Sequence, residues 1–92
     1  MPEIKVRFNI VFKKSAQKDL AKLERNVRQR IADAIETLAD NPYPVGSLKL
    51  AGFEDYRRIR VGSFRVVYQV IDNELIIFII RIADRKDVYK RL

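Results

Sequence analysis

The first part of the chain changes from an alternating to a helical hydrophobic period. Residues 4–12 alternate, and their apolar side chains fall on one parity: Ile4, Val6, Phe8, Ile10 and Phe12. Alternation of this kind predicts a strand with one face in the core. Lys13 and Lys14 end the pattern.

Two helices are predicted to follow, joined closely enough to form a hairpin. Ser15 is a suitable N-cap for a short helix that ends at about Leu23. Asn26 is a suitable cap for a longer one. Its apolar residues recur at helical spacing: Val27, Ile31, Ala34, Ile35 and Leu38. Pro42 and Pro44 prevent this helix from continuing.

A hairpin is predicted in the second half of the chain. Its strands cover residues 56–61 and 64–71. Gly62 and Ser63 lie between them, and this order places glycine where a type II′ turn requires it.

A third strand is predicted over residues 75–82. Asp72 and Asn73 would join it to the hairpin through a two-residue turn compatible with type I′. It is apolar on both faces until Arg81, so we expect it to be central or covered by a helix. Residues 84–92 form a short charged segment, either a terminal helical turn or a frayed tail.

The predicted element order is β-α-α-β-β-β. No repeat or linker interrupts the 92 residues, so residues 1–92 are expected to form a single domain. A helical hairpin packed on one face of a small antiparallel sheet is an α+β architecture. The other face of the sheet is then expected to be an uncovered working surface.

Composition narrows the chemistry that is possible. Hydrophobic residues make up 48% of the chain, enough for a core, which excludes intrinsic disorder. The chain has no cysteine and no histidine, so disulfides, thiolate nucleophiles and the commonest metal ligands are excluded. We expect no metal and no cofactor. Charged residues interrupt residues 1–12, and no apolar run reaches about 18 residues. A cytoplasmic protein without membrane contact is therefore expected.

The charge balance is strongly basic, with 19 basic and 12 acidic residues and a net charge of +7. Such an excess favours polyanionic partners. It is equally compatible with a surface that serves only solubility.

Arginines gather around the predicted hairpin. Arg58 and Arg60 fall on one face of its first strand, and Ile59 falls on the other. Across the turn, Arg60 should lie opposite Arg65. Because like charges directly opposite each other cost stability, the pattern favours an anion held between them. The alternative is a solvated basic face with splayed guanidinium groups.

A second basic cluster closes the chain around Tyr89. Its members are Arg81, Arg85, Lys86, Lys90 and Arg91. Cations with an interleaved aromatic ring suit RNA, although Tyr89 taken alone is more typical of a partly buried anchor. Arg57 and Lys49 are further candidates for RNA contacts, and Lys49 is equally consistent with a plain surface lysine.

Three segments of the chain resemble a known family. These are residues 49–52 (KLAG), residues 56–70 (YRRIRVGSFRVVYQV) and residues 84–89 (DRKDVY). Together they resemble the RelE/ParE toxin superfamily, and more narrowly its RelE branch. The resemblance implies a toxin of a toxin–antitoxin pair. It also implies a metal-independent endoribonuclease that enters the ribosomal A site and cuts mRNA there, by attack of the ribose 2′-OH on the adjacent phosphate.

The resemblance also implies roles for individual residues. Arg65 matches the arginine that contacts the scissile phosphate, and Arg85 matches the arginine near the leaving oxygen. Tyr89 matches the tyrosine that stacks on or orients the nucleotide. Arg58 and Arg60 match two positions that are lysines in the best-known members.

The two lysine-to-arginine differences affect the chemistry. A lysine with a lowered pKa can act as a general base, whereas arginine stays protonated. Arg58 and Arg60 are therefore assigned to phosphate binding and electrostatic stabilisation. The proton acceptor stays open among Lys49, ribosomal groups and three acids: Glu54, Asp55 and Asp84. We expect slow cleavage of RNA outside the ribosome.

The partners implied are mRNA on the ribosome and a cognate antitoxin, an acidic protein that folds as it binds. Two alternatives remain at this point. One is a ParE-like inhibitor of DNA gyrase, which has no need of Arg65, Arg85 and Tyr89. The other is a catalytically weakened toxin fold that only binds.

Overall fold

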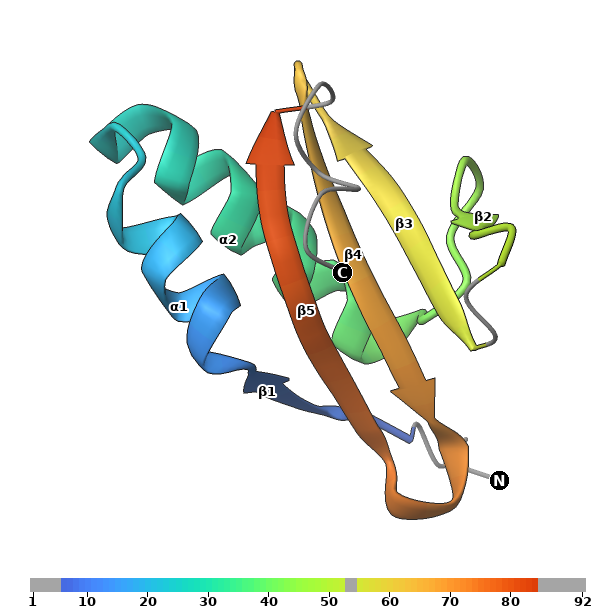
Figure 1. Ribbon diagram of the computed structural model, residues 1–92. Helices are drawn as coiled ribbons and strands as arrows, with labels where there is room; N and C mark the ends of the chain where they lie inside the picture. The colour runs from blue at the N-terminus through green and yellow to red at the C-terminus, as the bar shows by residue number, and fades with distance from the viewer. Residues whose placement is uncertain (1–5, 53–54, 85–92) are drawn as a thin grey trace.

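The computed structural model describes residues 6–52 and 55–84 (Figure 1). Its elements follow one another along the chain as β1 (Asn9–Phe12), α1 (Lys14–Ala21), α2 (Arg25–Asp40), β2 (Leu48–Lys49), β3 (Tyr56–Val61), β4 (Phe64–Ile71), the 3-10 turn η1 (Asp72–Glu74) and β5 (Ile76–Asp84). Neither α1 nor α2 is long and apolar enough to cross a membrane.

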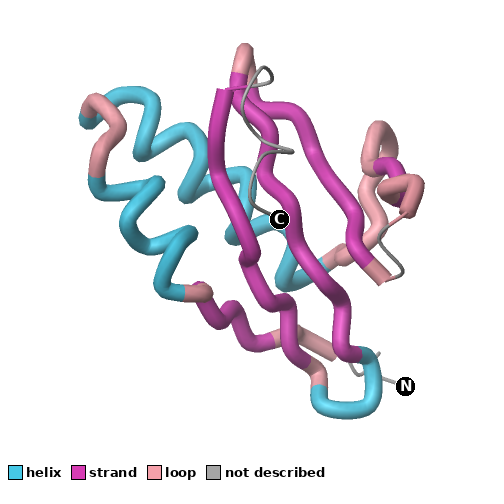
Figure 2. Tube along the Cα trace, in the orientation of Figure 1, coloured by secondary structure: helices cyan, strands magenta, loops and turns pink. Residues whose placement is uncertain are grey.

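The strands form one sheet in the order β1-β5-β4-β3-β2. Neighbouring strands are antiparallel, except that β1 runs parallel to β5. Both helices cover the same face of this sheet (Figures 1 and 2). The predicted α+β architecture is therefore confirmed, with β2 and the parallel pairing of β1 as additions to it.

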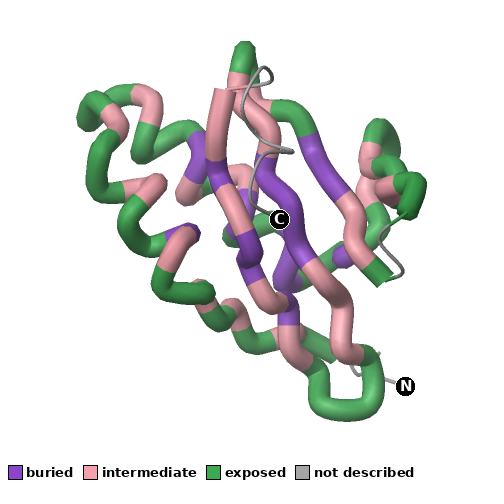
Figure 3. The backbone as a smooth tube through the Cα atoms, viewed as in Figure 1, coloured by how far each residue is buried: buried purple, intermediate pink, exposed green. Residues whose placement is uncertain are grey.

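The main core lies between the helices and the sheet. Its largest fully buried side chains come from α2 and from the central strands, where Figure 3 shows the buried backbone: Tyr68, Ile31, Leu38, Ile77, Ile79, Ile82 and Val66. The helical spacing of Ile31, Ile35 and Leu38 puts one stripe of α2 into the core that it shares with the sheet, as the pattern predicted.

Both predicted helix caps are wrong. Ser15 lies inside α1, whose N-cap is Lys13, and its hydroxyl donates to the carbonyl of Ile80 at 2.9 Å. Asn26 lies inside α2, whose N-cap is Glu24. The hydroxyl of Ser15 is used in a tertiary contact with β5, which local sequence cannot reveal.

The connection between β4 and β5 also differs from the prediction. Ile71 pairs with Ile76, so four residues form the connection instead of two. Three of them make η1, and Leu75 follows in the left-handed region with φ 55°. The third strand consequently begins at Ile76 and extends to Asp84, beyond the predicted end at residue 82. At the other end of the chain, β1 begins at Asn9, later than predicted.

The sheet face opposite the helices is not bare, which corrects the expectation of an uncovered surface. Val67 and Ile80 are buried there as the centre of a second apolar cluster. Partly buried residues pack around them: Leu50, Tyr56, Phe78 and Ala83. The reason is that β4 and β5 carry apolar residues on both faces, so each face must be at least partly shielded from water.

Candidate functional site

The β3–β4 hairpin brings two arginines face to face. Gly62, with φ 61°, opens the tight turn, and Val61 pairs with Phe64 across it. The next pair along the ladder is Arg60 with Arg65, as predicted. Residues paired in this way have side chains on the same face of a sheet, about 5 Å apart at Cβ. The hairpin therefore fixes two guanidinium groups on one surface.

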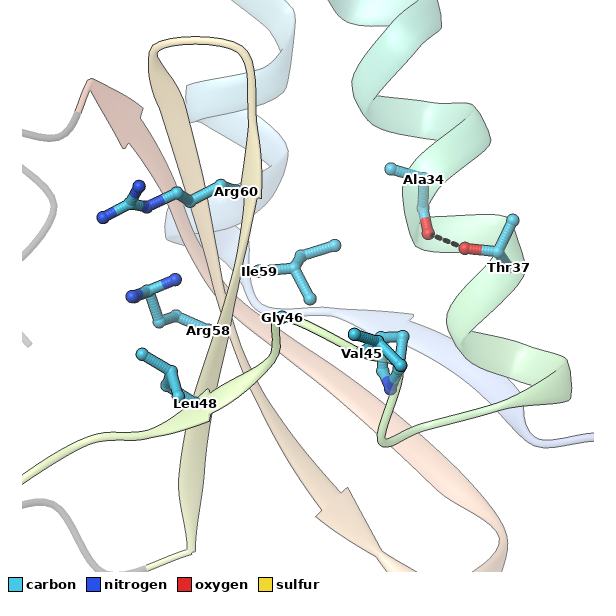
Figure 4. A pocket seen from close by; sticks show the side chains of 9 residues that line it. Ala34, Thr37, Val45, Gly46, Leu48, Arg58, Ile59 and Arg60 are labelled. Atoms are coloured by element: carbon cyan, nitrogen blue, oxygen red, sulfur yellow. Dashed lines mark hydrogen bonds between the residues drawn. The ribbon is translucent and has the colours of Figure 1, made fainter.

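Arg58 lies two residues before Arg60 and extends to the same side of β3. Figure 4 shows both side chains on that side and Ile59 on the other, toward α2. Arg58 is buried, with 8% of its surface exposed, and its strand partners are Leu48 and Val67. Within residues 6–52 and 55–84, no carboxylate forms an ion pair with it. A buried cation in this setting is stabilised by any anion that reaches it.

A groove of about 560 Å³ runs along β3 beside these arginines (Figure 4). Its walls come from α2, from the loop before β2 and from β3: Ala34, Thr37, Pro44, Val45, Gly46, Leu48, Arg58, Ile59 and Arg60. The hydroxyl of Thr37 donates to the carbonyl of Ala34 at 2.6 Å. Because this hydroxyl is already bonded within α2, the α2 wall of the groove is largely apolar. No sequence signal identified this groove, because its lining comes from segments far apart in the chain.

Arg57 does not join the other hairpin arginines. Its position in β3 has the parity of Ile59, and its guanidinium lies 5.0 Å from the centre of the Tyr43 ring. One of its nitrogens donates to the hydroxyl of Ser47 at 3.0 Å. Lys49, exposed on β2, pairs with Arg57 along the ladder. Both line a separate cavity of about 190 Å³, so the structure separates them from Arg58, Arg60 and Arg65.

Arg81 of β5 forms an ion pair with α1. Its guanidinium lies 4.0 Å from a carboxylate oxygen of Asp19 in α1, and both side chains are largely buried. The ladder is irregular next to it, between Val67 and Tyr68 of β4. The remaining predicted residues of the C-terminal cluster lie outside the described residues: Arg85, Lys86, Tyr89, Lys90 and Arg91.

None of the three described candidates for the proton acceptor lies among the hairpin arginines, and Glu54 lies outside the described residues. Lys49 lies with Arg57 at the smaller cavity. Asp55, with φ 70°, lines the smaller cavity beside Arg57. Asp84 pairs with Phe64, so its side chain belongs to the sheet face opposite that of Arg65. Within the described part of the chain, no group of three acidic residues is arranged to hold a metal ion. The arrangement can bind an anion and stabilise negative charge that develops on it.

Comparison with known proteins shows the family of the chain. The family model described as "ParE toxin of type II toxin-antitoxin system, parDE" matches residues 10–89. An Escherichia coli protein named "Putative RelE-like toxin protein" is 38% identical over 88 residues, covering 91% of this chain and 92% of that protein. The mRNA interferase toxin RelE of Escherichia coli K12 is 32% identical over 82 residues, covering 85% of each chain.

A solved structure shares the fold. In the crystal structure of the intact E. coli RelBE toxin–antitoxin complex, one chain superimposes with a TM-score of 0.73 at 30% identity. The superposition covers 85% of this chain and 95% of that one. With the family model matching most of the sequence, and with relatives and a solved structure of the RelE type, the chain belongs to the ParE/RelE family of type II toxin–antitoxin toxins as a RelE-like member.

Proposed function

We propose that this toxin is a metal-independent endoribonuclease that cleaves mRNA in the ribosomal A site. The observation that carries the proposal is the Arg60–Arg65 pair beside the buried Arg58. A sheet surface that holds cations opposite each other favours a bound phosphate. The similarity to proteins named mRNA interferase RelE supports an mRNA phosphodiester as that phosphate.

In the proposed reaction, the ribose 2′-oxygen attacks the adjacent phosphorus. The O2′–P bond forms and the 2′-OH proton passes to a ribosomal group, while the P–O5′ bond breaks and the 5′-oxygen takes up a proton from solvent to leave as a 5′-OH. Arg65 and Arg60 bind the non-bridging oxygens, whose negative charge grows in the transition state. Arg58 adds positive potential from a site of low solvent exposure, where a charge acts more strongly than in water.

The residues outside the described ranges complete the proposal. Arg85 is assigned to the leaving 5′-oxygen, and Tyr89 to stacking on the nucleotide. Arginine keeps its proton at neutral pH, so none of the hairpin arginines accepts the proton of the 2′-OH. The ribosome is proposed to supply groups for that step, which makes cleavage of free RNA slow.

The proposed inhibitor is an acidic antitoxin that folds as it binds. The similar E. coli chain was solved in a toxin–antitoxin complex, and this chain carries a net charge of +7. An acidic segment that covers Arg58, Arg60 and Arg65 would prevent a phosphate from reaching them.

The test compares Arg65→Gln with Arg7→Gln on ribosomes programmed with a defined mRNA. Arg7 is exposed and paired with Glu36 and Asp40, so its variant removes the same charge away from the hairpin. Primer extension should show about 100-fold slower cleavage for Arg65→Gln, the typical cost of one stabilising donor, and little change for Arg7→Gln. Equal rates for the two variants would refute the assignment. Rapid cutting of naked mRNA would refute dependence on the ribosome.

The ParE description of the matching family model supports a second candidate, inhibition of DNA gyrase. A supercoiling assay run beside the translation assay separates the two functions. Inhibition of supercoiling without any effect on translation would favour the gyrase target.

A further inference from the structure

The smaller cavity, of about 190 Å³, lies apart from the groove beside Arg58 and Arg60 and shares no lining residue with it. Its lining comes from the loop after α2, from β2 and β3, and from the junction of β4 with η1: Tyr43, Lys49, Asp55, Arg57, Val70 and Asp72. The volume corresponds to about six water molecules, at about 30 Å³ for each. A molecule of only a few non-hydrogen atoms fits this space, whereas a whole nucleotide does not.

Two cations stand together at this cavity. Lys49 and Arg57 pair along the β2–β3 ladder, so their side chains share one face of the sheet and repel each other. Arg57 donates to the hydroxyl of Ser47 at 3.0 Å, and its Nε is buried without an acceptor among the described residues. Within residues 6–52 and 55–84, no carboxylate forms an ion pair with either cation. Both positive charges are therefore open to an anionic group.

Two carboxylates line the same cavity, those of Asp55 and Asp72. Both residues are exposed, and neither forms an ion pair within the described part of the chain. The hydroxyl of Tyr43 donates to Oδ2 of Asp72 at 3.1 Å, which leaves Oδ1 to face another donor. The cavity thus offers acceptors for a cationic group beside its donors for an anionic one.

Tyr43 keeps the opposite charges of the cavity apart. Its ring lies against the guanidinium of Arg57, 5.0 Å from centre to Cζ, while its hydroxyl is bonded to Asp72. One aromatic side chain therefore holds a cation and an anion in fixed places, where they do not neutralise each other. Charges held in place in this way are preorganised for a ligand that carries both signs.

We propose that this cavity binds a small free α-amino acid as its zwitterion. The carboxylate of the ligand lies between Lys49 and Arg57, whose guanidinium fork matches a carboxylate. The ammonium donates to Asp72, and the partly buried side chain of Val70 contacts a short apolar side chain. Alanine is of the size that the volume allows. A phosphate is disfavoured, because Asp55 and Asp72 repel an anion that brings no positive charge of its own.

The site is independent of the proposed nuclease. Arg57 has the parity of Ile59, which points toward α2, whereas Arg58 and Arg60 extend to the other side of β3 (Figure 4). A ligand in the cavity does not touch the proposed phosphate site. Binding of an amino acid therefore requires neither RNA nor a ribosome, and it is measured without them.

The experiment follows the backbone amides of the isotope-labelled full chain by NMR while L-alanine is added. Propionate, which lacks the ammonium, and ethylamine, which lacks the carboxylate, are titrated at matched ionic strength. We expect saturable shifts at Lys49, Arg57 and Val70 with L-alanine, with a dissociation constant of about 0.1–10 mM, since so small a ligand makes few contacts. Propionate and ethylamine should each bind at least about 10-fold more weakly, because each lacks one charged hydrogen bond.

Asp72→Asn and Lys49→Gln test the two ends of the ligand. Both residues are exposed, and asparagine still offers Tyr43 an acceptor, so both variants should fold. Asp72→Asn should weaken alanine at least about 10-fold without weakening propionate, so that the preference for alanine is lost. Lys49→Gln should weaken both ligands. Lys18→Gln removes an exposed lysine of α1 and is the control, with alanine binding unchanged.

The outcomes that contradict the proposal are equally specific. Propionate or inorganic phosphate bound by the natural protein as tightly as alanine would identify a simple anion site and overturn it. Shifts that do not saturate with L-alanine would show that the cavity holds no amino acid. Alanine affinity that is unchanged in both Asp72→Asn and Lys49→Gln would place the ligand elsewhere and overturn the assignment.

Discussion

Tyr68 of β4 is the largest fully buried side chain of the core, and it carries a polar group into that core. Its hydroxyl donates to the carbonyl of Pro42 at 2.7 Å, just after α2 ends. Burial raises the pKa of this hydroxyl above its ordinary value, because ionisation would place a charge in the core. This hydrogen bond thus helps to tie the loop after α2 to the centre of the sheet.

Replacing Tyr68 by phenylalanine should lower the free energy of unfolding by about 1–3 kcal/mol, since the carbonyl of Pro42 loses its donor. The raised pKa also makes the natural protein lose stability as the pH rises above about 10, through the folded-state value. The variant should lose part of that pH dependence. Urea unfolding at neutral and alkaline pH checks both effects. Tyr43→Phe, which removes a more exposed bond to Asp72, is the control and should cost less at neutral pH. A Tyr68→Phe protein as stable as the natural one would contradict this account.

At the scale of elements, helix α1 lies along the C-terminal half of β5, where a neighbouring strand would otherwise pair with it. The ladder of β1 reaches only Ile79. Beyond it, Ser15 donates to the carbonyl of Ile80, and the amide of Ile82 donates to a carboxylate oxygen of Asp19 at 2.9 Å. Ser15 and Asp19 lie four residues apart on one side of the helix. They satisfy backbone groups that an exposed edge strand would offer to other chains.

Asp19→Ala should cost about 1.5–3 kcal/mol, the usual contribution of a hydrogen bond to a charged group, because the amide of Ile82 loses its acceptor. Asp19→Asn keeps an acceptor oxygen and loses only the ion pair with Arg81, so it should cost less. Urea denaturation of both variants measures the difference. Amide exchange at Ile82 should accelerate in the alanine variant alone. Equal exchange in the two variants would show that the carboxylate does not protect this edge.

At the scale of the whole molecule, positive charge accumulates on two opposite sides of a small body. The arginines lie on one side of the sheet, and exposed cations of α1 and α2 lie on the helical layer that covers the other: Lys14, Lys18, Arg25 and Arg28. The radius of gyration is 13.1 Å. The Debye length is about 30 Å at 0.01 M salt and about 10 Å at 0.1 M. The two sides therefore repel each other in dilute buffer and are screened at physiological ionic strength.

The melting temperature should consequently rise by several degrees when NaCl is increased from about 0.01 M to about 0.3 M. One kcal/mol corresponds to about 4–8 °C for a domain of this size. Thermal unfolding followed by circular dichroism measures the change, and an uncharged osmolyte at matched osmolality is the control. A falling melting temperature would show that local ion pairs, such as those of Arg7 with Glu36 and Asp40, outweigh the overall repulsion.

Prediction from sequence was most accurate where structure is decided by near neighbours. The bounds of β3 and β4 agree with the predicted 56–61 and 64–71, and the Arg60–Arg65 register follows from them. A strand period of two and a glycine in a tight turn are local properties, so they specify which residues share a face and which lie opposite each other. The helix stripe of Ile31, Ile35 and Leu38 is determined in the same way.

Tertiary structure alone decided which element lies beside which, and therefore what each polar side chain does. Four arginines of the strands have four different environments, which their positions in the sequence do not reveal. Arg57 packs on Tyr43, and Arg58 is buried. Arg60 is exposed, and Arg81 faces Asp19. The parallel pairing of β1 with β5 and the groove beside β3 likewise depend on segments far apart in the chain. Periodicity defines the faces of an element, but packing between distant elements selects the partners that those faces meet.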